Sequence, residues 1–359
     1  MNKKLLMVGI VIVLVIGVAF MMTNRGSQKQ EAAQETAATE VTQAADPTDY
    51  DEVTLRFCMS GSEQGVDYIS AKHFADKVAE ATGGKVKIEL FASNILAGGS
   101  QPEAINMLTQ GGSFELGLYS AAVLGNIDQQ FLVVMLPFIF DNYADVDKAL
   151  DGAGNDWMTK KMAEYNLVNF GAMHCGIKQW TNNKKEMKQP SDFKHFKMRI
   201  PGGKVSKAIW DALGADPVSM SWSEVYTALQ QGVIDGHENG YQTLYSNNIY
   251  EVQKYITEAN YQYDGYWFMA NKAAFDKLKP ATQELLHKLG NEMVHYGRDY
   301  LEKEEGRIKE ELIKKGNVIT VLTPEQKQAF IDATYPVIEK FHGVYGDEAY
   351  KAWGIELKK

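Results

Sequence analysis

The sequence predicts an α/β fold with room for two lobes, and three observations support this prediction. The chain has 359 residues, more than a single ordinary hydrophobic core organises. Apolar residues make up 45% and charged residues 23%, the composition of a globular protein. From residue 53 onward, period-2 and helical apolar patterns alternate, as they do in parallel sheets covered by helices.

Residues 1–22 differ from the rest of the chain. Lys3 and Lys4 precede an unbroken apolar run over residues 5–22, which is long enough to span a bilayer as a helix of about 27 Å. The positive charge before the run favours a cytoplasmic N-terminus and an extracytoplasmic chain after Met22. The segment is therefore a signal peptide or a signal anchor. A small-x-small cleavage pattern occurs only inside the run, which favours a retained membrane anchor.

Residues 23–50 form the predicted linker between this segment and the globular part. The stretch is rich in Gln, Glu, Ala and Thr and has almost no large apolar residue. Such a segment cannot bury enough surface to offset its chain entropy, so we expect a disordered linker. The formal net charge of −9 argues against a nucleic-acid partner, which would need a basic face.

The globular part opens as β-α-β. Apolar and polar residues alternate over 53–58 and again over 86–90, and a helical apolar face lies between them at 71–78. The elements expected next are a helix opened by a capping box at 100–103, a strand at 115–119, an apolar segment at 131–138, a helix over 144–165 and a strand at 167–173.

A second series of elements follows. It comprises a strand at 197–200 closed by a Pro-Gly-Gly turn, a helix at 205–212, a capped helix from 221 to Gly232, a long helix over 280–315, a strand at 318–322 and a last helix capped at 323–326.

The common motifs of catalysis are absent from the sequence. It lacks G-x-S-x-G, H-E-x-x-H and the phosphate-binding loop, and no two of its seven histidines stand four residues apart. We therefore expect neither an enzyme nor a bound cofactor or metal. Cys58 and Cys175 fit no metal or redox motif; they either pair in an oxidising compartment or remain free, buried thiols.

Arg199 is the most informative polar residue. Alternation along its strand puts Met198 and Ile200 on one face and Arg199 on the other, at the carboxyl end where open α/β sheets bind ligands. A guanidinium there can hold a carboxylate through two parallel hydrogen bonds. The same pattern also fits a surface arginine in an ion pair. Trp222 and Asn239 likewise fit either a pocket or a structural role.

Several ordered segments of the chain resemble one known family, the DctP-type solute-binding proteins of tripartite ATP-independent periplasmic (TRAP) transporters. They are SMSWSEVYTALQQGVIDGHEN (219–239), YSNNIYEVQKYIT (245–257), KHFKMRIPGG (194–203), HFADKVAEATGGKVKIELFASNILAGG (73–99) and VMLPFIF (134–140). The likeness runs from about residue 53 to 340.

The resemblance implies a two-lobed, periplasmic-binding-protein-like fold of two α/β domains, with a hinge and a long helix spanning both. We expect 51–175 with 266–304 in the first lobe and 176–265 with 305–359 in the second. The cleft between the lobes would close on a small organic anion and deliver it to the small and large membrane subunits of a TRAP permease.

The resemblance also implies roles for particular residues. Arg199 would hold the ligand carboxylate, and Asn239 and Trp222 would contact the ligand. Lys178 stands where the family usually has Arg, which keeps the charge but loses the fork geometry. Ser120 stands where the sialic-acid branch has an acidic residue, which argues against that ligand.

Two further positions follow from the same comparison. Ser60, after the first strand, is a cleft residue by its position, and Asn260 replaces a histidine frequent in the family. Two alternative functions stay open. The lobes could form the sensing module of a membrane kinase, or an extracellular hydrolase that would need Glu63 or Glu238.

Overall fold

The computed structural model describes residues 48–358. The predicted signal segment at 1–22 and nearly all of the predicted linker at 23–50 lie outside the described residues. Within 48–358, no helix combines the length and the apolar character needed to cross a bilayer.

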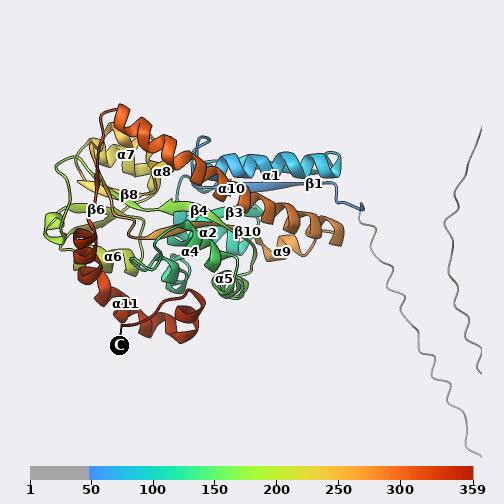
Figure 1. Cartoon of the computed structure of the whole chain (residues 1–359). Coiled ribbons are helices and arrows are strands. Elements are labelled where there is room, and N and C mark those ends of the chain that lie inside the picture. The colour runs from blue at the N-terminus through green and yellow to red at the C-terminus, as the bar shows by residue number, and fades with distance from the viewer. Residues whose placement is uncertain (1–47, 359) are drawn as a thin grey trace, which may run out of the picture. The chain divides into compact units, whose positions relative to one another are not determined.

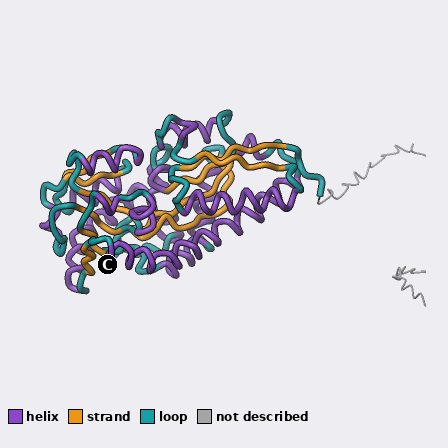
Figure 2. Tube along the Cα trace, turned by 90° about the horizontal axis from the view of Figure 1, so that it is seen from above, coloured by secondary structure: helices purple, strands orange, loops and turns teal. Residues whose placement is uncertain are grey.

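The described chain is built on two mixed sheets, with helices on both sides of the strands (Figures 1 and 2). In spatial order, the first sheet contains β2 (Val86–Phe91), β1 (Val53–Met59), β3 (Leu116–Ser120), β10 (Tyr263–Asn271) and β4 (Leu167–Ile177). β1 pairs in parallel with β2 and β3, whereas β10 runs antiparallel to β3 and β4.

The second sheet contains shorter strands. In order they are β11 (Val318–Val321), β9 (Tyr255–Glu258), β5 (Gln179–Asn182), β8 (Gly236–Asn239), β6 (Lys197–Ile200) and β7 (Asp216–Ser219). β6 pairs in parallel with β7 and β8, and β9 with β11. β5 runs antiparallel to both of its neighbours.

Eleven α-helices connect and cover the strands within the described part of the chain. They are α1 (Val66–Thr82), α2 (Gln101–Gln110), α3 (Ala121–Leu124), α4 (Tyr143–Leu150), α5 (Ala153–Ala163), α6 (Lys204–Ala212), α7 (Trp222–Gln230), α8 (Tyr241–Ser246), α9 (Lys272–Phe275), α10 (Pro280–Lys314) and α11 (Pro324–Ala352). Short 3₁₀ helices lie at Ile95–Ala97, Gln129–Met135, Pro190–Phe193 and Ile249–Glu251.

Most of the expected elements are confirmed, and one expectation is wrong. The helix expected over 144–165 is two helices, because Gly152 adopts a non-helical conformation (φ −138°, ψ −141°) at the start of α5. The apolar segment expected at 131–138 is largely the 3₁₀ helix Gln129–Met135, whose residues 131–135 are all buried.

The long helix α10 contacts the cores of both sheets. Met293 and Leu301 belong to the core that α1 and α10 form against the first sheet, around stacked Phe57 and Phe268. Farther along the helix, Leu312 packs with α7 and α8 beside the second sheet. The 35-residue helix therefore spans both sheets, as the family resemblance implies (Figure 1).

A third core runs between the sheets along α11. Near the start of that helix, Phe330 packs on Trp180 of β5 with ring centroids 4.6 Å apart. Just past its end, Trp353 packs edge-on against Trp267 of β10 at 6.5 Å. The last residues of the chain thus contact the first sheet as well as the second. The predicted lobe boundaries themselves remain a prediction.

Candidate functional site

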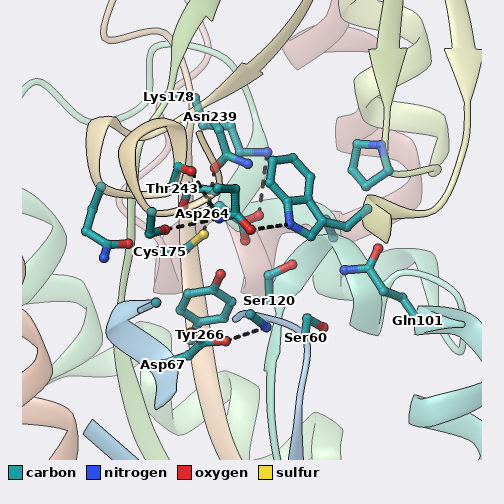
Figure 3. A pocket seen from close by; sticks show the side chains of 18 of the residues that line it. Ser60, Asp67, Gln101, Ser120, Cys175, Lys178, Asn239, Thr243, Asp264 and Tyr266 are labelled. Atoms are coloured by element: carbon teal, nitrogen blue, oxygen red, sulfur yellow. Dashed lines mark hydrogen bonds and ion pairs between the residues drawn. The ribbon is translucent and has the colours of Figure 1, made fainter. Parts of the chain in front are cut away.

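A polar cavity lies where the two sheets approach each other. Loops and strand ends of both sheets line it, together with the first turns of α7 and α8. Its lining residues are Ser60, Gly61, Gly65, Asp67, Gln101, Ser120, Ala122, Cys175, Lys178, Arg199, Pro201, Trp222, Asn239, Gln242, Thr243, Ser246, Asn247, Asp264 and Tyr266. In Figure 3, Ser60 and Asp67 lie on the opposite side of the cavity from Lys178 and Asn239.

The cavity forms at the carboxyl ends of parallel strands, where α/β sheets commonly bind ligands. Ser60 follows β1, Ser120 ends β3 and Arg199 lies near the end of β6. Trp222 begins α7, whose capping box is closed by Glu224 accepting from the backbone N–H of Ser221 at 3.1 Å. Local strand and cap signals therefore position four of the predicted site residues.

Arg199 is buried, with 4% of its surface exposed, so it is not the surface arginine that the sequence also allowed. Its Nε and Nη2 donate to the Met220 carbonyl at 3.1 and 2.9 Å, and the guanidinium lies 5.5 Å from the centroid of the Trp222 ring. Within residues 48–358, no carboxylate forms an ion pair with it. Burial lowers the pKa of Arg199 to about 10, which leaves the group charged at neutral pH.

Lys178 is the second buried cation of the cavity, and it is fully paired. Its ammonium nitrogen lies 3.3 Å from Glu238 and 3.5 Å from Asp264. Burial lowers the pKa of Lys178, but the two carboxylates outweigh burial and raise it above its ordinary value. The lysine therefore stays charged, with its charge already balanced by protein groups.

Two amides complete this side of the cavity. Asn247 accepts a hydrogen bond from the indole N–H of Trp222 at 3.3 Å, which fixes the ring over the cavity. Asn239 accepts from the backbone N–H of Gly240 at 3.1 Å. Because this bond engages the side-chain oxygen of Asn239, the amide nitrogen is the atom of this side chain that can donate to a ligand.

Two carboxylates in the cavity were missed by sequence reasoning. Asp264 accepts from the backbone N–H of Ala121 at 3.1 Å, and burial raises its pKa. Asp67 accepts from the backbone N–H of Gly61 at 2.7 Å, and burial raises its pKa to about 6. The glycines at positions 61 and 65 were a sequence clue to Asp67. A Cβ at either position would lie 2.2–2.3 Å from its carboxylate, so only glycine fits beside it.

Six of the eight predicted site residues line the cavity: Ser60, Ser120, Lys178, Arg199, Trp222 and Asn239. The other two do not. Glu63 is exposed in the turn before α1, and Glu238 is buried behind the lining, against Lys178. Asn260 also lies outside the cavity, where it accepts from the Gln179 side chain at 2.6 Å. Neither glutamate of the hydrolase alternative therefore faces the cavity.

The two cysteines are free and buried. Cys175 lines the cavity, and burial raises the pKa of its thiol well above the ordinary range. Burial also raises the pKa of Cys58. Of the two alternatives left open by the sequence, the structure shows the free, buried thiols.

Two α/β units around a polar cleft with a buried arginine define a bacterial solute-binding protein. Residues 57–343 match the family described as "Bacterial extracellular solute-binding protein, family 7", and the chain belongs to that family. The family binds solutes rather than catalysing reactions.

The chain is similar to named members of this class. It is 30% identical over 311 residues to the C4-dicarboxylate-binding protein DctB of Bacillus subtilis (strain 168), covering 86% of this chain and 87% of that protein. Its fold matches the galactonate-bound sugar acid binding protein of Advenella mimigardefordensis strain DPN7T, with a TM-score of 0.82 and 25% identity over 85% of this chain and 98% of the other.

A TRAP solute-binding protein from Sulfurospirillum deleyianum with bound succinate gives a TM-score of 0.80 and 28% identity, covering 85% of this chain and 100% of that one. The solved relatives thus include a protein that binds a sugar acid and one that binds a dicarboxylate.

Proposed function

We propose that this chain is the extracytoplasmic receptor of a TRAP transporter, which binds a small organic acid by a contact between the ligand carboxylate and Arg199. The single observation that supports this most strongly is the guanidinium of Arg199, which is buried against the cavity and has no carboxylate within ion-pair distance in the described chain. A buried charge without a direct ion-pair partner is costly, and a ligand carboxylate would supply that partner through two charge-assisted hydrogen bonds.

Binding would favour closure of the two lobes. Arg199 and Trp222 belong to the second-sheet side of the cavity, whereas Ser60, Ser120 and Asp67 belong to the first-sheet side. A ligand that contacts both sides binds the closed form more tightly and shifts the equilibrium by that difference in affinity. We propose that the rigid bodies are 51–175 with 266–304 and 176–265 with 305–359, and that the closed form is the one delivered to the permease.

The balance of charge in the cavity favours a ligand with one carboxylate and several hydroxyl groups. Lys178 is paired with Glu238 and Asp264, whereas Arg199 is the cavity-lining cation without a direct ion pair among residues 48–358. A second ligand carboxylate would find no free cation there and would lie near Asp264 and Asp67. Hydroxyl groups could instead donate to those carboxylates. Of the ligands bound by relatives, this pattern fits galactonate better than succinate.

The experiment is calorimetric titration of the purified globular part with galactonate, erythronate and succinate. We expect a sugar acid to bind with at least tenfold higher affinity than succinate. Arg199→Met should weaken binding at least 100-fold, whereas the control Arg56→Met should not, because Arg56 pairs with Glu115 outside the cavity. If no organic acid in a wider panel binds, the proposed function is wrong; if succinate binds best, only the proposed ligand class is wrong.

The sensing alternative uses the same cavity and differs in the partner. Permease genes beside the gene for this chain would support transport, and a membrane kinase gene in their place would support sensing.

A further inference from the structure

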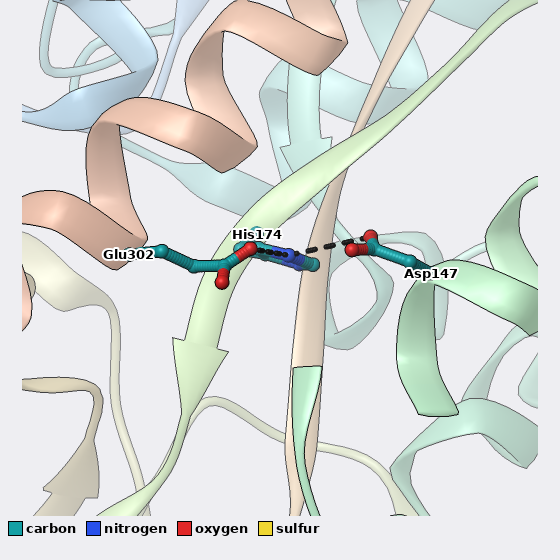
Figure 4. Close-up of side chains that lie close together, drawn as sticks. All are labelled: Asp147, His174 and Glu302. Atoms are coloured by element: carbon teal, nitrogen blue, oxygen red, sulfur yellow. Dashed lines mark ion pairs between the residues drawn. The ribbon is translucent and has the colours of Figure 1, made fainter. Parts of the chain in front are cut away.

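A second cluster of ionisable groups lies on β4, α4 and α10, away from the ligand cavity (Figure 4). His174 on β4 points between Asp147 of α4 and Glu302 of α10. Cys175, the next residue of the strand, lines the ligand cavity. Since successive side chains of a strand point to opposite faces, the cluster and the cavity lie on opposite sides of β4.

The distances in the cluster are too long for hydrogen bonds. The Nε2 atom of His174 lies 3.5 Å from Oδ1 of Asp147 and 3.6 Å from Oε1 of Glu302, and all three atoms lie within 4.8 Å of one another. Good hydrogen bonds between such atoms would be about 2.7–3.2 Å long. Ligand atoms around a tetrahedral zinc ion with bonds of about 2.0–2.2 Å are roughly 3.3–3.6 Å apart.

The imidazole has the orientation that a metal ligand needs. His174 is completely buried, and its Nε2 has no hydrogen-bond partner within residues 48–358. Its Nδ1 lies 3.1 Å from the hydroxyl of Tyr263. With Nδ1–H donating to that hydroxyl, the Nε2 lone pair faces the two carboxylates, as metal binding requires.

The charge around the cluster is negative. Asp147, Asp151, Asp299 and Glu302 act on one another here, and Arg298 is the cation in contact with them. The hydrogen bonds of Arg298 go to the Ala172 carbonyl at 2.9 Å and to Asp151 at 2.7 Å. Its Nη1 approaches Oδ1 of Asp147 to 3.2 Å, yet that oxygen is buried without a hydrogen bond. Arg298, with His295 at longer range, therefore balances only part of the charge of these four carboxylates.

We propose that Asp147, His174 and Glu302 bind a divalent transition-metal cation, with zinc as the probe that fits best. One imidazole nitrogen and two carboxylate oxygens form a ligand set suited to zinc, cobalt or nickel, with solvent completing the coordination. Magnesium and calcium prefer all-oxygen sites, so we expect neither to compete at equal concentration. The ion would join α4, β4 and α10 and would stabilise the folded chain.

The test uses the globular part without a polyhistidine tag, stripped with EDTA and titrated with zinc by calorimetry. We expect one zinc ion per chain and a rise in melting temperature on zinc addition. Glu302→Gln should weaken binding at least tenfold. Its side chain is 43% exposed, so the substitution spares the core. The control is Glu292→Gln, an exposed position of the same helix, which should bind like the parent.

Cobalt supplies a second readout, because coordination by these side chains gives it a visible absorption band that Glu302→Gln should remove. Two results would overturn the proposal. Zinc binding unchanged by Glu302→Gln would place the ion elsewhere. No zinc binding by the parent chain would mean that His174 is a neutral, buried imidazole that holds no metal, in keeping with the burial that lowers its pKa to about 3.

Discussion

The two faces of β4 carry opposite imbalances of charge. On one face, the cavity contains Arg199, a buried cation without a direct ion pair in the described part of the chain. On the other face, Asp147 and Glu302 flank an imidazole nitrogen without a hydrogen bond. Lys178 also lines the cavity, but it is paired with two carboxylates. The sign of the missing charge indicates the kind of ligand: an anion in the cavity and a cation in the cluster.

The largest effect on stability should come from replacing Lys178, the cation that is paired with two carboxylates. Lys178→Met would leave Glu238 and Asp264 buried without their partner. Removing one partner of a buried ion pair typically costs about 3–5 kcal/mol, so we expect a loss of that order in the free energy of unfolding. Urea denaturation measures it. A variant as stable as the parent would show that Lys178 is not the partner that these carboxylates require.

Arg199→Met should affect stability differently from Lys178→Met, because it removes a buried cation that has no direct ion pair in the described chain. Without ligand, its free energy of unfolding should equal or exceed that of the parent, since a buried charge without a counter-ion is replaced by an apolar chain of similar length. Ligand affinity should fall about 100- to 1,000-fold. Urea denaturation and calorimetry measure the two effects. A large loss of stability in the ligand-free protein would contradict the unbalanced state of Arg199.

Asp67 should make stability depend on pH. Its pKa in the folded protein is about 6, above the ordinary value of 3.8. The folded state therefore holds this proton more tightly than the unfolded state does. The resulting stability is complete below about pH 4 and is lost as pH rises through about 6, up to about 3 kcal/mol.

The measurement is the difference in unfolding free energy between the parent and Asp67→Asn at several pH values. This difference should change between pH 4 and 6.5 and should be flat above that range. A flat difference throughout would show that Asp67 titrates as an ordinary carboxyl group.

The smallest effect should be a change in ligand preference. Asp264→Asn would remove one of the two carboxylates that balance Lys178. Lys178 would keep its pair with Glu238, but Asp264 would no longer repel a second ligand carboxylate, so we expect the affinity for succinate relative to galactonate to rise about tenfold. Parallel calorimetric titrations measure this ratio. An unchanged ratio would show that Asp264 does not set the preference between these two ligand classes.

Local sequence signals predicted the parts of the site that depend on neighbouring residues. Alternation and the Pro-Gly-Gly turn placed Arg199 at the end of β6, and a capping box placed Trp222 at the start of α7. The family resemblance added Lys178 and Asn239, which the structure brings into the same cavity. Alternation and capping boxes report on structure within about ten residues, so they could not supply these two residues.

Long-range pairing explains what the sequence could not supply. Asp264 reaches the cavity because β10 inserts between β3 and β4, more than 80 residues away along the chain. The four-residue strands β5 and β8 read QWTN and GHEN, with no apolar alternation to mark them. Pairing with each other defines these two strands. The cluster around His174 likewise depends on the approach of α4 and α10 to β4.

The most direct test of the central claim is a thermodynamic cycle that removes the charge on each side of the Arg199 contact. The affinities of the parent and Arg199→Met are measured for the best-binding acid and for its carboxamide. We predict that the parent binds the acid at least 100-fold more tightly than the amide and that Arg199→Met binds the two equally. If Arg199→Met keeps the same preference for the acid, the ligand carboxylate does not bind at Arg199.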